Sequence, residues 1–362
     1  MSDWKEYKLG DVVEIKYGKD HKGLSAGVIP TYGSGGIMRY VDKAIYEEES
    51  ILIPRKGSLN NLFYKNEPFW TVDTMFYTKI NKNNVFPKFL FYQLTTIDYS
   101  NLNVGSAVPS LTVPVLNDIN IFLPPIAEQI KIASVLGSLD NKIELLNRQN
   151  KTLEQLAEIL FREWFVEGGN ENKVKLGEVV KTSSGGTPSR AKMEYYYNGT
   201  IKWVKSKELN GDFIFDTEEK ITNEAVKKSS AKLFPSNTVL IAMYGATVGE
   251  FGIIANPSTC NQAICALLSN ENYPYTFLFL LTKYNKERLI NMAIGSAQQN
   301  ISQELIQQLE IPKPSGRIKE FHFKVEPMFL KIRSNTKQIH TLNQLRDVLL
   351  PKLMSREVKV NS

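Results

Sequence analysis

The feature that most constrains this chain is an internal repeat, because a duplicated sequence folds twice into the same plan. KLGDVV at residues 8–13 returns as KLGEVV at residues 175–180, 167 positions later. Four further pairs of segments follow in the same order: ILIPRKGS (51–58) with VLIAMYGA (239–246), TVDTMF (71–76) with CNQAIC (260–265), VGSAVPSLT (104–112) with IGSAQQNIS (294–302), and TLEQLAEIL (152–160) with TLNQLRDVL (341–349). Their offsets of 188 to 190 indicate a tandem duplication with one insertion early in the second copy.

Each copy shows short apolar runs, then a short helix, then a long helix. Runs such as SILIPRKGS and FWTVDTMFYTKI are broken by Gly, Pro, Asn and Ser, which is typical of strands and turns. Short helices are predicted in PKFLFYQLTTI and in YTFLFLLTKYNKERLINMA. The long helices are predicted from about Ala127 to Phe165 and from about Lys324 to Met354, after prolines that favour helix entry.

The first long helix carries residues at alternating steps of four and three, which is the spacing of a coiled-coil seam. Because equivalent helices that join equivalent halves are related by a twofold axis, we expect the two long helices to pack antiparallel. The polar Asn150 either fixes the register of this pair or lies at a solvated position. The predicted seam consists of Leu139, Ile143, Leu146, Asn150, Leu153, Ala157, Leu160 and Trp164 in the first helix, and of Val325, Phe329, Ile332, Thr336, Ile339, Leu342, Leu349 and Leu353 in the second.

These patterns predict an α+β protein with two tandem-duplicated globular α/β domains. Two long antiparallel coiled-coil helices would join and separate the domains, with pseudo-twofold symmetry. The predicted bounds are 1–123 and 168–318 for the globular domains, 124–167 for the first helix, and 319–362 for the second helix and C-terminal tail. No apolar run has the length of a membrane span and no signal peptide is evident, so we expect a cytoplasmic protein.

Motifs for catalysis are missing from the sequence. There is no GxxxxGK[ST] phosphate loop and no [ND]PP[YF] motif of an amino-methyltransferase, and the three histidines are scattered. Cys260 and Cys265 lie in an apolar stretch without a nearby histidine, so we expect buried packing and neither zinc nor a disulfide. The acidic stretches EEE (47–49) and DTEEK (216–220) are interpreted as solvated turns. We therefore expect a binding protein with no catalytic centre and no metal site.

Loops in both copies mix cations with Ser, Asn, Gln and aromatic residues. Lys and Arg suit phosphate oxygens, and Arg, Lys, Asn and Gln can read base edges in the major groove. Any polar loop can have this composition, and a net charge of +6 only permits nucleic-acid binding, so the recurrence in both copies carries the prediction. The candidate DNA-binding residues are Lys19, Lys22, Tyr32, Ser34, Arg39, Arg55, Lys56, Ser58 and Asn60 in the first copy, and Ser184, Thr187, Ser189, Arg190, Lys205, Lys207, Tyr244, Gln298, Gln299 and Asn300 in the second.

Several of these stretches resemble the specificity subunit of type I restriction–modification systems. KLG[DE]VV, PTYGSGGI, RKGS and SGGTPSR followed by IKWV resemble its target-recognition domains. FREWF at 161–165 and LLPKLMSREV at 349–358 resemble the ends of its two helical regions. The resemblance spans nearly the whole chain. It departs from the family pattern at Arg356, where Gly is expected, and at TVDT (71–74), which replaces an NQAI-like stretch.

The resemblance implies a division of labour within a larger complex. Each globular domain would read one half of a split double-stranded DNA target, and the helices would act as a ruler between the halves. The same helices would dock two modification subunits, which bring S-adenosylmethionine and methylate adenine N6. Restriction subunits would add ATP- and Mg-dependent translocation and cleavage, in defence against foreign DNA. This chain would hold no cofactor of its own.

Two other classes of protein remain open from the sequence. A stand-alone DNA-binding regulator built from a duplicated domain would be expected to carry a helix-turn-helix or similar reader, and none is evident. A nuclease with a divergent active site would need more acidic residues than the DTEEK stretch at 216–220 contains. A requirement for a modification-type partner separates the specificity subunit from both.

Overall fold

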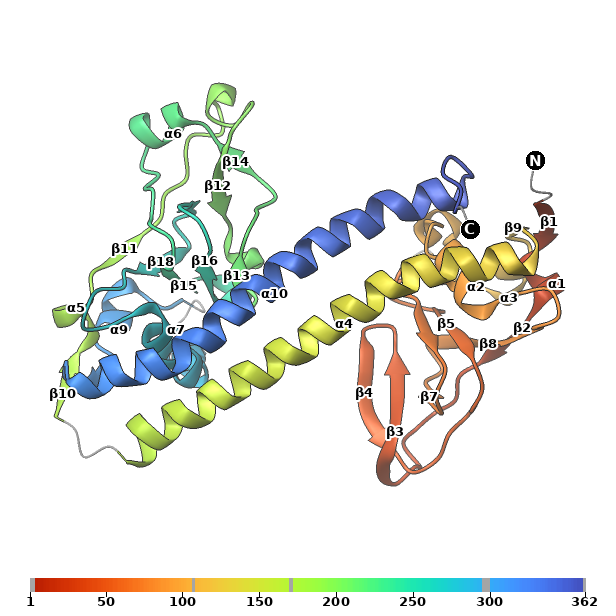
Figure 1. Cartoon of the computed structure of the whole chain (residues 1–362), viewed down its shortest axis with the longest axis horizontal. Helices are drawn as coiled ribbons and strands as arrows, with labels where there is room; N and C mark the ends of the chain where they lie inside the picture. The colour runs from red at the N-terminus through yellow and green to blue at the C-terminus, as the bar shows by residue number, and fades with distance from the viewer. Residues whose placement is uncertain (1–3, 106–107, 169–171, 295–299, 361–362) are drawn as a thin grey trace. The chain divides into compact units, whose positions relative to one another are not determined.

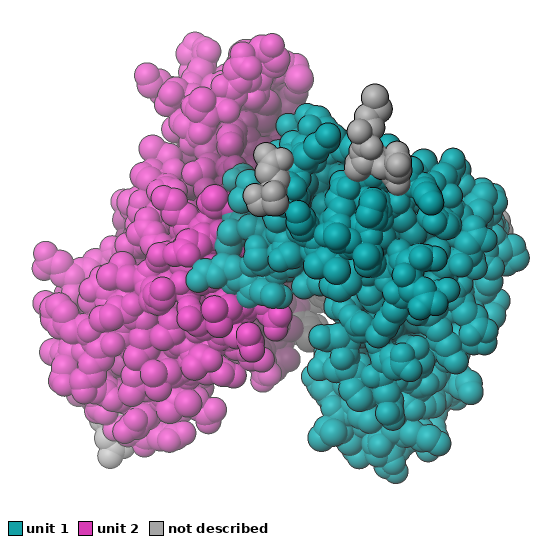
Figure 2. All heavy atoms as spheres, turned by 45° about the vertical axis from the view of Figure 1, so that its right-hand side comes forward, with its two compact units in different colours: residues 1–142, 342–362 teal, residues 143–341 magenta. Residues whose placement is uncertain are grey.

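The computed structural model describes residues 4–105, 108–168, 172–294 and 300–360, and the chain divides into two compact units (Figures 1 and 2). Unit 1 consists of residues 1–142 and 342–362, and unit 2 of residues 143–341. Each unit contains the strands of one copy of the repeat. Each long helix changes unit along its length, so that both units contain part of both helices.

Unit 1 folds around a four-stranded sheet of order β2-β8-β5-β6, with a three-stranded sheet β4-β3-β7 and the strand pair β1-β9. Its central strand β5 is buried throughout, as expected for an uninterrupted apolar run. The strands are β1 (Lys5–Lys8), β2 (Val13–Tyr17), β3 (Ala26–Gly33), β4 (Gly36–Val41), β5 (Ser50–Pro54), β6 (Phe63–Lys65), β7 (Trp70–Thr71), β8 (Met75–Ile80) and β9 (Asn120–Leu123), and the short helices are α1 (Leu9–Val12), α2 (Pro87–Leu94) and α3 (Val113–Asn117).

Unit 2 repeats this plan with the sheets β11-β18-β15-β16-β13 and β14-β12-β17 and the pair β10-β19. Its strands are β10 (Lys173–Lys175), β11 (Thr182–Ser184), β12 (Ile201–Val204), β13 (Phe213–Ile214), β14 (Lys220–Ile221), β15 (Val239–Ala242), β16 (Phe251–Ile254), β17 (Thr259–Cys260), β18 (Ile264–Leu267) and β19 (Glu310–Pro312). Its short helices are α5 (Leu176–Val179), α6 (Asn223–Lys228), α7 (Tyr275–Tyr284), α8 (Lys286–Ile294) and α9 (Gln303–Gln307). The predicted short helices of both copies are thereby confirmed.

The duplication extends to individual backbone hydrogen bonds. At the start of the first copy, Leu9 N donates to Ile119 O at 2.9 Å, and at the start of the second, Leu176 N donates to Leu309 O at 2.8 Å. The antiparallel pairs β1-β9 and β10-β19 hold these contacts on one side. The repeated KLG[DE]VV segment is therefore a repeated structural element, which closes each domain by pairing its first strand with its last.

The long helices are α4 (Ile126–Arg162) and α10 (Gly316–Met354), and α4 continues into a π-helical turn at Glu163–Glu167. The predicted first helix is confirmed to within a few residues. The predicted start of the second, near Lys324, is wrong by two turns. Ile318 and Phe321 are fully buried in the unit 2 core, and this packing stabilises helical turns that lie outside the heptad pattern. Within the described residues, no helix is both long and apolar enough to span a membrane.

Within unit 2 the two helices pack antiparallel. Asn150 Nδ2 lies 3.2 Å from Thr336 Oγ1, whereas the Phe165 ring, further along α4, lies 5.1 Å from the Phe321 ring, which is earlier in α10. Asn150 Oδ1 also accepts a hydrogen bond of 2.9 Å from Asn335 Nδ2. The solvated alternative for Asn150 is therefore not what the structure shows, and its role in register stays a prediction.

The polar contacts of the seam reach the globular part of unit 2. Thr336 Oγ1 donates to Asp212, which precedes β13, at 3.0 Å. Burial raises the pKa of Asp212. All predicted seam residues are buried or half-buried, so the spacing correctly identified the inner face of each helix.

Both cores include helical residues from both copies. Ile132, Ala133 and Leu136 of α4 lie in the unit 1 core together with Leu353 of α10. The unit 2 core includes Ile318, Phe321, Val325 and Phe329 of α10 together with Ala157 and Phe161 of α4. Each domain therefore buries its apolar surface with its own helix and with the end of the other copy's helix.

Arg356 follows the end of α10 and adopts a left-handed conformation, with φ of 67°. Such a φ disfavours residues with a Cβ and is typical of a glycine after a helix, which gives a physical reason to expect Gly at this position. The Arg356 guanidinium lies 4.8 Å from the centre of the Trp4 ring, and this cation–π contact offsets part of the strain.

The two effects at Arg356 predict an order of stability. Arg356→Ala removes the cation–π interaction with Trp4 and keeps the strain, so the free energy of unfolding should fall by about 0.5–1 kcal/mol. Arg356→Gly removes the same interaction but relieves strain of about 1 kcal/mol, so it should be close to the wild type. Urea unfolding of the three proteins measures this order, and an alanine variant as stable as the glycine variant would contradict the strain argument.

Candidate nucleic-acid interface

A loop frame occurs at the same place in both copies. In unit 1, Lys56 after β5 forms a single antiparallel bridge with Ser110. In unit 2, the equivalent Tyr244 after β15 forms the same bridge with Asn300. The repeated segments RKGS and YGA are thus joined to the repeated segments that precede α3 and α9. In unit 2 both bridged residues are predicted site residues, whereas in unit 1 only Lys56 is predicted and Ser110 is not.

The residue after each bridging position is a glycine with positive φ. Gly57 has φ of 89° and Gly245 has φ of 69°, which a residue with a Cβ rarely adopts. A Cβ on Gly57 would also lie 2.9 Å from Ser34 Oγ, the predicted site residue in the β3–β4 turn. The glycine therefore permits three loops of unit 1 to approach one another closely.

The predicted cations of the first copy, like many other lysines of the described chain, have no ion-pair partner. Among the residues that the structure describes, no carboxylate lies within 4.0 Å of the charged nitrogens of Lys19, Lys22, Arg39, Arg55 or Lys56. Arg55 donates to the carbonyl of Asp73 at 3.1 Å, and Arg39 donates to the carbonyl of Leu24 at 3.1 Å. These side chains keep their positive charge available to an external anion.

Two of the predicted residues line one groove of unit 1. Lys22 and Ser34 are joined there by His21, by the Gly33–Gly35 turn and by the Asp73–Thr74 segment. Ser34 is held in place through its carbonyl, which accepts a hydrogen bond of 2.7 Å from Asn61 Nδ2. Ser58 is exposed in the adjacent loop. The groove combines a cation, a hydroxyl and a histidine, which are groups that can contact phosphate, with the carboxylates of Asp20 and Asp73, which repel it.

Two predicted contacts of the first copy have structural roles instead. Tyr32 is 5% exposed and packs in the core with Leu52 and Phe69, because its β3 position pairs with β7 as Val204 pairs with β17 in the second copy. The prediction that it forms part of the surface is wrong. Asn60 uses both ends of its amide within the protein: Nδ2 donates to Asp98 at 3.0 Å and Oδ1 accepts from Tyr99 N at 2.8 Å. It organises a loop.

The small polar residues predicted in the second copy are only partly available. Ser184 Oγ donates to Gln303 at 2.7 Å, and Thr187 Oγ1 donates to Gln262. Ser189 is exposed, as is Tyr244, whose exposed fraction is 42%. Gln298 and Gln299 lie outside the described residues.

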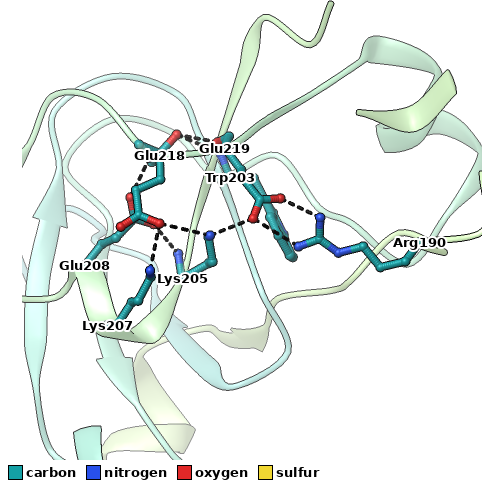
Figure 3. Close-up of polar contacts among 8 residues, drawn as sticks. Arg190, Trp203, Lys205, Lys207, Glu208, Glu218 and Glu219 are labelled. Atoms are coloured by element: carbon teal, nitrogen blue, oxygen red, sulfur yellow. Dashed lines mark hydrogen bonds and ion pairs between the residues drawn. The ribbon is translucent and has the colours of Figure 1, made fainter. Parts of the chain in front are cut away.

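The predicted cations of the second copy form one ionic network (Figure 3). Arg190 Nη1 and Nη2 donate to the two carboxylate oxygens of Glu219 at 2.6 and 3.2 Å. Lys205 Nζ lies 2.6 Å from Glu219 and 3.2 Å from Glu218, and Lys207 Nζ lies 2.8 Å from Glu218. Three cations thus share two carboxylates, so most of their charge is neutralised.

The Arg190 guanidinium of this network also stacks on aromatic rings. Its centre lies 4.4 Å from the Tyr196 ring and 5.1 Å from the Trp203 ring. Trp203 is held by its indole N–H, which donates to the carbonyl of Gly186 at 3.0 Å. Hydrogen bonds from Arg190 and Lys205 lower the pKa of Glu219 to about 2. Glu219 therefore stays ionised over the neutral range, and the ion pair is lost only as the pH falls through that value.

The interpretation of DTEEK as a solvated turn therefore fails for Glu219, which is half-buried in the network; Glu218 is exposed in a bend, but its ion pairs with Lys205 and Lys207 were not predicted. Arg190 lies 29 residues from Glu219 along the chain. The pairing of β12 with β14 places Glu219 beside Trp203, and Arg190 reaches Glu219 from a separate loop that precedes β12. In the sequence, only the closeness of acidic and basic residues indicated ion pairing, and this pattern did not show which residues pair.

The two cysteines are buried and unpaired, as predicted. Burial raises the pKa of both thiols, to about 12 for Cys265, so neither is a reactive thiolate. Across the described part of the chain, no three His, Cys, Asp or Glu residues are grouped so that they could hold a metal ion.

The sequence matches a family model at both copies. The type I restriction modification DNA specificity domain matches residues 1–155 and again residues 169–341. The chain belongs to this family. Its two halves are therefore two specificity domains, in agreement with the repeated strands and loop frames.

Full-length relatives support the same assignment. The chain is 26% identical to the type I restriction enzyme MjaIX specificity subunit of Methanocaldococcus jannaschii, over 99% of this chain and 94% of that protein. It is 25% identical to the HindI specificity subunit of Haemophilus influenzae, over 99% of this chain and all of that protein. The fold is similar to that of the type I S subunit from M. genitalium, with a TM-score of 0.67 and 17% identity over 97% of this chain and 96% of the other.

The cations of the first domain predict a salt-dependent contribution to DNA binding. Lys22→Gln and Lys56→Gln should each weaken binding to random-sequence duplex and reduce the slope of log K against log salt by about one for each phosphate that the side chain no longer neutralises. Lys16→Gln is the control, because Lys16 is already paired with Glu14 at 2.5 Å. Fluorescence anisotropy at several salt concentrations measures the slopes. Equal slopes for all three variants would show that the wrong face of the domain was chosen.

Proposed function

We propose that this chain is the DNA-reading subunit of a type I restriction–modification complex and recognises a bipartite target. The observation that carries the proposal is the repetition of one loop frame, at Lys56–Ser110 and at Tyr244–Asn300, in two domains that each match the specificity-domain family. Two equivalent readers in one chain suit a target with two half-sites. Their loops differ in sequence, so each half-site would have its own base sequence.

In this proposal the long helices serve as a coiled-coil spacer with pseudo-twofold symmetry. The antiparallel contacts of α4 and α10 within unit 2 and the buried seam residues support it. The segments 124–167 and 319–362 would then form the ruler, and 1–123 and 168–318 the target-recognition domains. A helix rises about 1.5 Å per residue, so helix length would determine the unread gap between half-sites.

We further propose that the helices dock two modification subunits. In unit 2, α4 has a second stripe of apolar side chains beside the seam: Leu145, Leu156 and Ile159 are 40%, 45% and 61% exposed. They occur at heptad spacing, with Thr152 between them, which suits packing against helices of a partner. The stripe is large for a surface with no partner.

The chemistry of the complex would lie in its other subunits. The modification subunits would bring S-adenosylmethionine for adenine N6 methylation, and restriction subunits would use ATP and Mg to translocate and cleave foreign DNA. This chain would contribute specificity and assembly without a catalytic step, in the cytoplasm. The alternative, a stand-alone regulator with a duplicated DNA-binding domain, would need no partner on the apolar stripe.

Exchange of one recognition domain tests the bipartite reading. Residues 173–315 run from β10 to just before α10, so replacing them by the equivalent part of a relative leaves most of both long helices unchanged. Methylome sequencing of a host that expresses the variant with its modification subunit should show one half of the methylated motif changed. The other half and the spacing should persist. A motif altered in both halves would contradict independent reading by the two domains.

A charge on the apolar stripe tests the docking surface. Leu156→Asp and Ile159→Asp should prevent co-purification of the modification subunit, because a carboxylate would be buried in the interface without a partner. Asn147→Asp is the matched control, since Asn147 is exposed on another face of α4. Circular dichroism should show that all three variants remain folded. Co-purification that survives both stripe variants would favour the stand-alone regulator.

A further inference from the structure

The predicted site cations of the two recognition domains differ in whether they are paired with carboxylates. In the first domain, five predicted cations have no carboxylate within 4.0 Å among the described residues. In the second, Arg190, Lys205 and Lys207 are all paired with Glu218 or Glu219. The domains share a backbone plan, so the difference lies in the side chains of the loops. Attraction to DNA does not explain why the cations of the second domain are paired, because the carboxylates of Glu218 and Glu219 repel DNA phosphates.

We propose that Glu219 is a specificity-determining residue that holds Arg190 and Lys205 away from non-specific phosphate contacts. The inference rests on the proposed function, since it assumes that the second domain reads DNA. In this arrangement Arg190 contacts DNA only where the duplex offers acceptors good enough to replace Glu219. Random DNA, whose base edges do not present the matching pattern of acceptors, gains little from this side chain.

The geometry favours a held side chain over a loose surface pair. Arg190 is anchored by two hydrogen bonds to one carboxylate and by cation–π contacts with the Tyr196 and Trp203 rings. A bidentate pair of this kind leaves three of the five guanidinium N–H groups for an outside partner. Lys205 is more enclosed, with a side chain 19% exposed, and bridges Glu219 to Glu218. Glu219 therefore neutralises the charge of Arg190 and also fixes the orientation of its guanidinium group.

The consequence for DNA binding follows from counterion release. Each Lys or Arg that reaches a phosphate adds about 0.9 to the slope of log K against log salt and strengthens binding to every sequence alike. A cation neutralised within the protein adds little to that term. Discrimination is the difference between specific and random binding, so weakening only the random term increases it.

The network lies in the segment that distinguishes the second copy. Arg190, Lys205 and Glu219 fall between KLGEVV and VLIAMYGA, where the offset between the copies grows from 167 to 188. The insertion is therefore in or beside the region that contains this network. We therefore assign the restraint on non-specific phosphate contacts to the second domain, and so to one half-site only.

The test compares variants in the complete complex with the modification subunit. Glu219→Gln should raise affinity for random-sequence duplex and steepen its salt slope by about one to two, as one or two cations are released. Affinity for duplex containing the complex's own methylated motif should change less, so the ratio of the two affinities falls several-fold. Glu310→Gln is the charge-matched control, because Glu310 lies on β19 and forms only a 4.0 Å pair with Lys173.

A second variant separates release of Arg190 from damage to the fold. Arg190→Gln combined with Glu219→Gln should return random-DNA affinity towards the wild-type value, because the released cation is absent. A damaged domain would instead lose affinity for both duplexes. Random-sequence binding that is unchanged in Glu219→Gln, or equally raised in Glu310→Gln, would overturn the inference. Failure of the wild-type complex to prefer its motif would overturn the proposed function itself.

Discussion

The rest of the structure depends on the way the long helices complete the hydrophobic cores. Leu353, near the end of α10, is buried in the core of the first domain, while Ala157 and Phe161 of α4 are buried in the core of the second. Each domain thus needs the far end of the other copy's helix. Because apolar surface must be covered for a domain to be stable, neither copy is self-sufficient, and the duplication is also a mutual structural dependence.

Because the helices and strands stabilise each domain, the loops can differ between the two domains. The closing pairs β1-β9 and β10-β19, the three-stranded sheets and the bridged loops recur in both domains, and the larger sheet of the second domain has one additional strand, β13. What differs is the chemistry at the ends of the strands: Lys56 and Ser110 stand in one frame where Tyr244 and Asn300 stand in the other. A rigid scaffold that presents different loops suits the proposed reading of two different half-sites.

The charge arrangement shows how loops on one scaffold can differ in more than their base contacts. In the proposed function, a groove cation such as Lys22 would favour any duplex, whereas the Arg190 charge is neutralised by its pair with Glu219. A reader that combines both would gain encounter rate from one domain and selectivity from the other. The mildly basic net charge of +6 conceals this asymmetry, because composition counts paired and unpaired cations alike.

The sequence by itself determined the duplication, the family, the short helices and the inner faces of the long helices, since these follow from repeats and periodicity along the chain. It misplaced the start of α10, because Ile318 and Phe321 are held helical by the core and not by heptad spacing. It also treated Tyr32 as a surface residue and DTEEK as a solvated turn. Tyr32 is buried by strand pairing, and Arg190 meets Glu219 across 29 residues because its loop folds over Trp203, beside which Glu219 lies. Contacts between residues distant in the chain were decided by the tertiary structure, because no local pattern encodes which side chains will meet.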